Sequence, residues 1–217
     1  MSPQTTEKWD LVVLHSDLTM GKVLEILLKE RRKSLGIKEI NFKLVQALFH
    51  DPDVLENWKI YLSPFYSKAE HALVIFDWTG SGAEKTGKRP ENLAEELKEA
   101  INKDARKTNW VGVVIIVPEL EVWIWADSIH VPHALGFRDK NYKQFKDYLI
   151  STFADLWPAA SQKPSQPEEL LGKIRKMKSL PISSSLFKEI AEKASLAHCS
   201  DTSFQKLRDT LQRWFKA

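Results

Sequence analysis

Acidic residues follow three separate apolar segments of the chain. Asp77 ends the segment "HALVIFD", Asp17 stands shortly after "WDLVVLH", and Glu119 and Glu121 follow "WVGVVIIV". If these segments are parallel strands, their carboxyl ends meet at one edge of a sheet, which is where open α/β sheets bind ligands. Clustered carboxylate oxygens suit Mg²⁺ or Mn²⁺, which proteins hold through one or two carboxylates together with water and substrate phosphate. The sequence therefore predicts a metal site formed by Asp77, Glu121 and Glu119.

Each acid also has a structural interpretation. Asp17 in "HSDLT" has the position of a helix N-cap, and Glu119 and Glu121 can complement a helix dipole in the first turn. The "GSG" after Asp77 lets a backbone approach a phosphate closely, but it fits neither the Walker nor the dinucleotide-binding pattern. His15, beside Asp17, is either a proton shuttle or a buried neutral side chain.

Basic residues are concentrated in one stretch of the second half. Between Lys163 and Lys178, five positive residues stand against two acids. Lys173, Arg175 and Lys176 are therefore candidate nucleic-acid-binding residues. The alternative is an ordinary solvated helix face.

Strand and helix patterns alternate in the first part of the chain. Valine- and leucine-rich runs cover residues 9–15, 41–49, 71–77 and 110–117, and helical spacing covers 18–36, 51–62 and 89–107. Asp51 is expected to cap the second of these helices. The alternation predicts an α/β fold with a mainly parallel sheet and helices on both faces.

From Glu119 onward only helical patterns follow, at 119–127, 140–153, 168–177, 184–196 and 201–215. The proline-containing stretch 157–169 reads as a connecting loop. We therefore expect an α/β domain over 1–157 and an all-helical C-terminal extension, packed on it, over 158–217. The stripe of Phe204, Leu207, Leu211 and Phe215 is expected to dock on the core.

Composition narrows the class of protein. The 217 residues, 43% hydrophobic and 28% charged, suffice for one core and do not indicate disorder. A net charge of +3 does not by itself indicate nucleic-acid binding. Cys199 is the single cysteine, which excludes an internal disulfide and a thiolate metal cluster. With no secretory signal or apolar span evident, we expect a cytoplasmic protein that does not enter a membrane.

Three segments together resemble a known group. "LVVLHSDLTMGKVLEILL", "LVIFDWTGSG" and "VIIVPELEVWIWAD" occur in the same order as the segments of TOPRIM-like proteins of bacterial phage defence, the RloB-like and related groups. The resemblance covers about Leu11 to Asp127, and it matches Glu121 and Trp123 to a P-x-x-E-x-W helix. It implies a TOPRIM-like sheet and Mg²⁺-dependent chemistry on a phosphodiester.

The sequence departs from that family at two positions. The family's glutamate after the first strand is missing, and Asp17 would replace it with a shorter reach. The family's Asp-x-Asp is reduced to Asp77 followed by Trp78 and Thr79.

Two hypotheses follow from this comparison. The first is a divalent-metal-dependent nuclease or phosphodiesterase of anti-phage defence, with Asp17 or His15 in proton transfer. The second is a catalytically degenerate subunit or sensor that acts with a larger subunit of a defence complex.

Overall fold

The protein is built on a four-stranded sheet in which every strand runs parallel to its neighbours. The structure is a computed structural model that describes residues 7–181, 184–194 and 199–217. The strand order is β2-β1-β3-β4. The strands are β1 Trp9–His15, β2 Phe42–Gln46, β3 Ala69–Asp77 and β4 Val111–Ile116. The predicted α/β class with a parallel sheet is confirmed.

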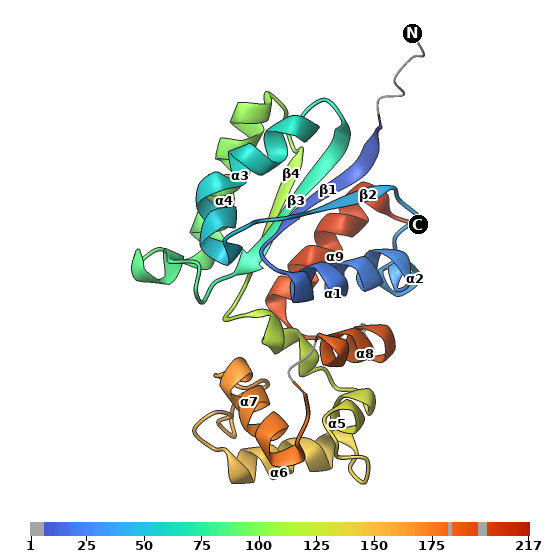
Figure 1. Cartoon of the computed structure of the whole chain (residues 1–217), viewed down its shortest axis with the longest axis vertical. Helices are drawn as coiled ribbons and strands as arrows, with labels where there is room; N and C mark the ends of the chain where they lie inside the picture. The colour runs from blue at the N-terminus through green and yellow to red at the C-terminus, as the bar shows by residue number, and fades with distance from the viewer. Residues whose placement is uncertain (1–6, 182–183, 195–198) are drawn as a thin grey trace.

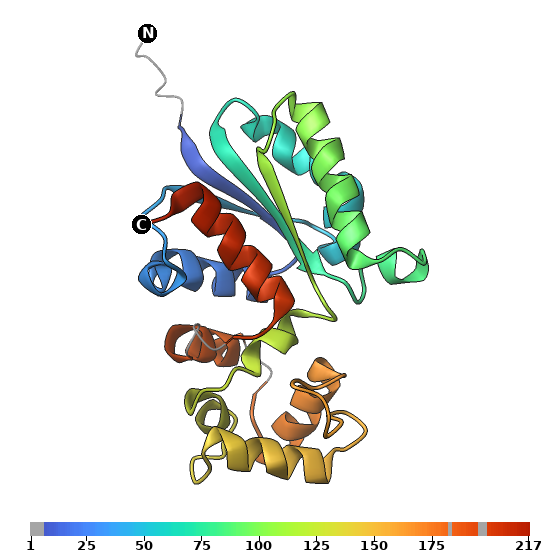
Figure 2. The same ribbon diagram turned by 180° about the vertical axis from the view of Figure 1, so that it is seen from behind.

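Helices cover both faces of this sheet. In Figures 1 and 2, α1 and α9 lie on one face and α3 and α4 on the other. Their bounds are α1 Leu18–Lys29, α3 His50–Leu62, α4 Pro90–Ala105 and α9 Thr202–Phe215. Short elements join them: α2 Arg32–Leu35, η1 Ser63–Phe65 and η2 Ala83–Lys85.

The two-sided cover explains why the strands read as continuous apolar runs. Leu11 and Val13 pack in the core beneath α1 and α9, whereas Val12 and Leu14 pack beneath α3 and α4. Successive side chains of a strand point to opposite faces, so both faces must be apolar when both are buried.

Local signals set the limits of the helices. Gly36, with φ of 72°, ends α2 in the left-handed conformation that glycine adopts readily. Pro90 occupies the first turn of α4, where its missing N–H has no helical partner to lose. The prediction for Asp51 was wrong: α3 begins at His50 with Phe49 at the N-cap position. The carboxylate of Asp51 is used instead in a contact with β3, described below.

The second part of the chain forms a helical lobe beyond the carboxyl ends of the strands (Figure 1). Its elements are η3 Leu120–Ile124, α5 His130–Ala134, α6 Tyr142–Thr152, α7 Pro167–Lys178 and α8 Ser185–Lys193. Within the described residues, no helix combines the length and apolar character needed to cross a membrane.

The helix expected over 119–127 is only a short 3-10 helix, Leu120–Ile124. Trp123, in this segment, makes hydrogen bonds to residues far away in the sequence. The indole N–H of Trp123 donates to Asp201 Oδ1 at 3.1 Å and to Ser203 Oγ at 2.8 Å. The indole is thereby tied to the first turn of α9, where Asp201 is the N-cap.

The last helix does not stay with the lobe but returns to the sheet. In Figure 2, α9 runs along the sheet beside β4, and its predicted stripe (Phe204, Leu207, Leu211, Phe215) is buried there. Conversely, α5 and α6 lie in the lobe, although both precede residue 158, where the sequence predicted the start of the helical extension. One continuous apolar core joins the sheet face beneath α9 to the lobe. Sheet and lobe are thus packed together, with the carboxyl edge of the sheet between them.

Candidate active site

A cleft of about 500 Å³ lies between the carboxyl edge of the sheet and the helical lobe. The loop after β1, the end of β3, η3 and helices α7 and α8 contribute to it. Its lining includes Asp17, Thr19, Asp77, Thr79, Gly80, Glu119, Glu121, Glu168, Arg175 and Phe187. The sheet topology therefore brings Asp17, Asp77, Glu119 and Glu121 into one cleft.

Asp77 is the most deeply buried acid of the cleft. Its side chain is only 9% exposed, and Oδ1 has no hydrogen-bond partner among the described residues. Burial raises the pKa of this carboxyl well above its usual value, and the nearby charges of Asp51, Glu121 and Asp17 raise it further. The backbone N–H of Leu120 opposes this by favouring the charged form. A buried carboxylate with a free oxygen and acidic neighbours is an environment that a cation would stabilise.

Asp51 holds the end of β3 in place. Strand β1 ends at His15, which pairs with Ile75 of β3. Asp77 lies two residues further along β3, so β1 offers no residue opposite its N–H. Asp51 Oδ1 accepts this N–H at 2.8 Å. Burial raises the pKa of Asp51, which the hydrogen bond from Asp77 partly opposes. Sequence reasoning missed this role, because nothing local to α3 indicates that its first turn touches the neighbouring strand.

Glu121 is the second partly buried acid facing the cleft. Burial raises its pKa to about 7, and the charges of Glu119, Glu168 and Asp17 act in the same direction. The charge of Glu121 raises the pKa of Asp77, and the charge of Asp17 raises the pKa of both carboxyl groups, so Asp77 and Glu121 belong to one electrostatic cluster. A group with a pKa near 7 can hold or release a proton under physiological conditions.

Glu119 and Asp17 line the cleft but also make structural contacts. Glu119 Oε1 accepts the backbone N–H of Glu168 at 2.9 Å, in the first turn of α7. Asp17 is the N-cap of α1, and its Oδ1 accepts the N–H groups of Thr19 at 2.6 Å and Met20 at 2.9 Å. One oxygen of each carboxylate is therefore already used, which leaves less of either group for a metal ion.

The Asp17 cap provides a test of its role. We expect Asp17→Ala to lower the free energy of unfolding by about 1 kcal/mol, the usual loss for an N-cap. Asp17→Asn should keep the stability, because an amide oxygen caps equally well. Urea denaturation of the two variants measures the difference. If both variants unfold like the parent protein, the cap contributes nothing.

His15 lies outside the cleft. Its ring is 4% exposed and packs against Gly21 of α1, where an added Cβ would lie 2.6 Å from the ring. His15 Nδ1 is 2.9 Å from the carbonyl oxygen of Asp17, and burial lowers the pKa of the imidazole. These contacts match the buried neutral histidine that was the alternative to a proton shuttle. His198 lies outside the described residues.

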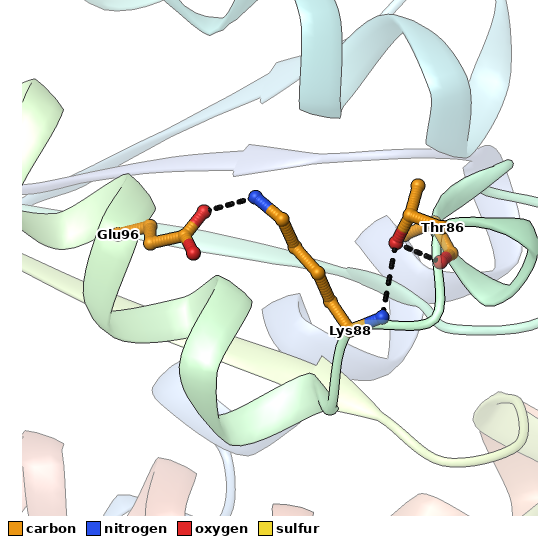
Figure 3. A network of polar contacts seen from close by, with 4 residues as sticks. Thr86, Lys88 and Glu96 are labelled. Carbon is orange, nitrogen blue, oxygen red and sulfur yellow. Dashed lines mark hydrogen bonds and ion pairs between the residues drawn. The ribbon is translucent and has the colours of Figure 1, made fainter.

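The glycines after Asp77 shape a loop at the mouth of the cleft. Gly80 and Gly82 have φ values of 87° and 84°, and an added Cβ would meet nothing within 4 Å at either position. Backbone conformation, not close approach of another group, accounts for them. Figure 3 shows how the far end of the loop is anchored: Lys88 Nζ donates to Glu96 Oε2 of α4 at 2.5 Å, and the N–H of Lys88 donates to Thr86 Oγ1 at 3.3 Å.

The three basic candidates on α7 have different surroundings. Lys173 is exposed and pairs with Glu169 at 3.1 Å, and Lys176 is exposed. Arg175 instead lines the cleft, and its buried Nε and Nη2 make no hydrogen bond within the described part of the chain. A guanidinium in this state is suited to an anionic group, because its planar fork matches phosphate and carboxylate oxygens.

The acidic residues partly fit the expected divalent cation. In the described ranges, no three His, Cys, Asp or Glu side chains converge as a ready group of metal ligands. Mg²⁺ does not require three, since one or two carboxylates with water and phosphate suffice. Asp77, with its free buried oxygen, and Glu121, in the same acidic cluster, are the pair that fits.

Comparisons with known proteins do not extend this picture. The chain matches no protein-family model, no curated protein and no solved structure.

Proposed function

We propose that the protein cleaves phosphodiester bonds of a nucleic acid with the help of Mg²⁺ or Mn²⁺. The observation that carries the proposal is the buried Asp77 carboxylate, with a free Oδ1, in the same cleft as Glu121 and Arg175. The resemblance to TOPRIM-like proteins supports it as well, and a cytoplasmic role in anti-phage defence belongs to the same proposal.

On this proposal, the residues of the cleft have different roles. Asp77 and Glu121 would hold the cation, and Arg175 would bind a phosphate oxygen through N–H groups that make no hydrogen bond within the described residues. Asp51 fixes Asp77 by accepting its backbone N–H, so the carboxylate keeps its position. A bound divalent cation would polarise the phosphate and stabilise the charge that develops on the departing oxygen.

The decisive experiment measures cleavage of labelled single-stranded and double-stranded DNA and RNA with Mg²⁺, Mn²⁺ or EDTA. We expect metal-dependent cleavage by the parent protein and its loss in Asp77→Ala and Glu121→Ala. Glu95→Ala is the matched control, because Glu95 is a surface glutamate paired with Lys98 at 3.0 Å. Cleavage that survives both cleft substitutions would exclude this site as its source.

Two observations favour a second candidate, the catalytically degenerate subunit. Asp17, the residue in place of the family's glutamate, is committed to capping α1. The described residues also hold no ready group of three metal ligands. On this alternative, the parent protein neither binds a divalent cation at the cleft nor cleaves any of the four substrates, and it acts by binding another subunit.

A further inference from the structure

Two large apolar side chains project from the loop between β2 and α3. Leu48 is 77% exposed and Phe49 is 74% exposed. Apolar side chains are normally removed from water on folding, at about 25 cal/mol for each Å² buried. A phenylalanine on the surface is common by itself, so its meaning depends on how firmly it is held and what it adjoins.

The loop is held rigidly. The buried Asp53 carboxylate accepts the N–H of Leu48 at 2.9 Å and that of Phe49 at 3.1 Å. The same carboxylate accepts Asn57 Nδ2 at 2.7 Å and the hydroxyl of Tyr61. His50, which follows, adopts a φ of 59°, a left-handed conformation that is uncommon outside glycine. The hydrogen bonds to Asp53 thus hold the backbone that presents Leu48 and Phe49.

The loop also adjoins the candidate active site. Asp51, two residues after Phe49, accepts the N–H of Asp77 at 2.8 Å. On its other side, the N–H of Ala47 donates to the carbonyl of His15 at 2.9 Å, directly before the segment that carries Asp17. The loop and the first turn of α3 therefore contact β1 and β3, two of the three strands that deliver the acidic residues, and the loop carries an exposed ring.

We infer that Phe49 is a stacking platform for a base of a single-stranded nucleic acid whose phosphodiester enters the cleft. The inference rests on the proposed function and names its substrate class. Aromatic side chains stack on any base in a sequence-tolerant manner, but only where the base face is free, as in single strands. Phe49 for a base, Arg175 for a phosphate and Asp77 for a cation form a complementary set.

A protein partner is the less favoured occupant. A stable protein interface buries about 800 Å² on each partner. Among the exposed large apolar residues described, Leu48 and Phe49 lie on this loop and Leu18 follows the neighbouring strand β1. The others lie on other segments: Ile60, Val117, Ile129 and Met177. Three such side chains suit a base better than an interface of that size.

The test compares two oligomers of equal length, an oligothymidylate and an abasic oligomer with the same backbone. Binding is measured by fluorescence anisotropy with Ca²⁺, a hard cation with oxygen ligands. We expect Phe49→Ala to weaken binding of the oligothymidylate about 5- to 150-fold, which corresponds to the roughly 1–3 kcal/mol that a base typically loses with its aromatic partner. Binding of the abasic oligomer should not change.

Further variants separate stacking from other effects. Phe49→Trp should retain the affinity, and Phe49→Leu, apolar but without a ring, should lose it. Ile60→Ala is the matched control, because Ile60 is 69% exposed on the same helix that follows the loop but stands ten residues from its start. Near-identical melting temperatures confirm that the variants are folded.

Four results would overturn the inference. Unchanged affinity of Phe49→Ala for the oligothymidylate excludes stacking, while metal-dependent cleavage sensitive to Asp77→Ala would leave the proposed function intact. If the parent protein cleaves only duplexes, the single-stranded substrate is wrong, but the proposed function stands. A dimer in sedimentation analysis that Phe49→Ala dissociates assigns the loop to self-association instead. If no oligomer binds and none is cleaved, both the inference and the proposed function fail.

Discussion

Asp77→Asn is expected to stabilise the protein in EDTA and to abolish its response to divalent cations. In the absence of metal, burial and acidic neighbours disfavour the charged form of this carboxyl group, and one of its oxygens is unpartnered within the described residues. The asparagine oxygen can still accept the N–H of Leu120, but it carries no charge. We expect a gain of about 1–3 kcal/mol in the free energy of unfolding at pH 8. For a chain of this size, each kcal/mol raises the Tm by about 2–4 °C.

The cation response should be the larger effect. A cation that binds only the folded parent protein stabilises it by about 2.7 kcal/mol at one hundred times its Kd and by about 4.1 kcal/mol at one thousand times its Kd. Asp77→Asn should lose this gain, so that the variant is the more stable protein in EDTA and the less stable one in saturating Mg²⁺ or Mn²⁺. Thermal unfolding of both proteins, with and without each cation, measures this reversal.

Asp139→Asn is the matched control for this experiment. Asp139 is an exposed aspartate that pairs with Lys140 at 3.2 Å and is not among the residues that line the cleft. The control should respond to Mg²⁺ like the parent protein. An equal response in Asp77→Asn and in the parent would place the cation elsewhere, and no response in either would favour the degenerate subunit.

The sequence predicted the location of the cleft because one physical rule connects distant segments. Parallel strands present their carboxyl ends at one edge, so residues after β1, β3 and β4 must come together whatever lies between them. Asp77 and Glu121 could be paired on that basis, although 44 positions separate them in the chain. The continuous apolar runs of the strands carried the same information, since they require helices on both faces.

The roles of individual residues depended on contacts that no local pattern encodes. Asp51 has the sequence context of a helix cap, but its carboxylate reaches Asp77 on a different strand. Trp123 lies in a segment with helical spacing, but its indole bonds to Asp201 and Ser203 near the other end of the chain. Conversely, Asp17 was ambiguous from sequence, and its geometry is that of a cap. Pattern thus located the functional edge, and tertiary contacts decided how its residues are used.

Glu121→Gln is expected to remove a pH-dependent penalty from the folded protein. The pKa of Glu121 is raised from 4.5 to about 7, mainly by burial. Between these values the folded protein binds more protons than the unfolded chain, so stability falls as pH rises through this window. The shift corresponds to a cost of about 3 kcal/mol that is fully present above pH 7 and absent below about pH 4.5.

The variant should therefore exceed the parent protein by about 3 kcal/mol at pH 8 in EDTA and equal it near pH 4.5. Urea denaturation across this range measures the difference in free energy of unfolding between the two proteins. Asp77, whose pKa is also raised, makes stability fall with rising pH in both proteins, so the difference reports on Glu121. Glu95→Gln should run parallel to the parent at every pH. A constant offset between Glu121→Gln and the parent would mean that the side chain contributes packing but does not titrate in this window.

The same experiment with Mg²⁺ connects this penalty to function. A cation at the cleft favours the charged forms of its carboxylates, so it should lower the pKa of Glu121 and offset the cost of burying it. At pH 8 the stability gain from Mg²⁺ should then be larger in the parent than in Glu121→Gln, and it should shrink toward pH 5, where protons compete with the cation. The burial of Glu121 destabilises the metal-free protein, and a bound cation that offsets this cost would explain why an acid is buried there. A gain from Mg²⁺ that does not vary with pH in the parent would show that Glu121 is not that partner.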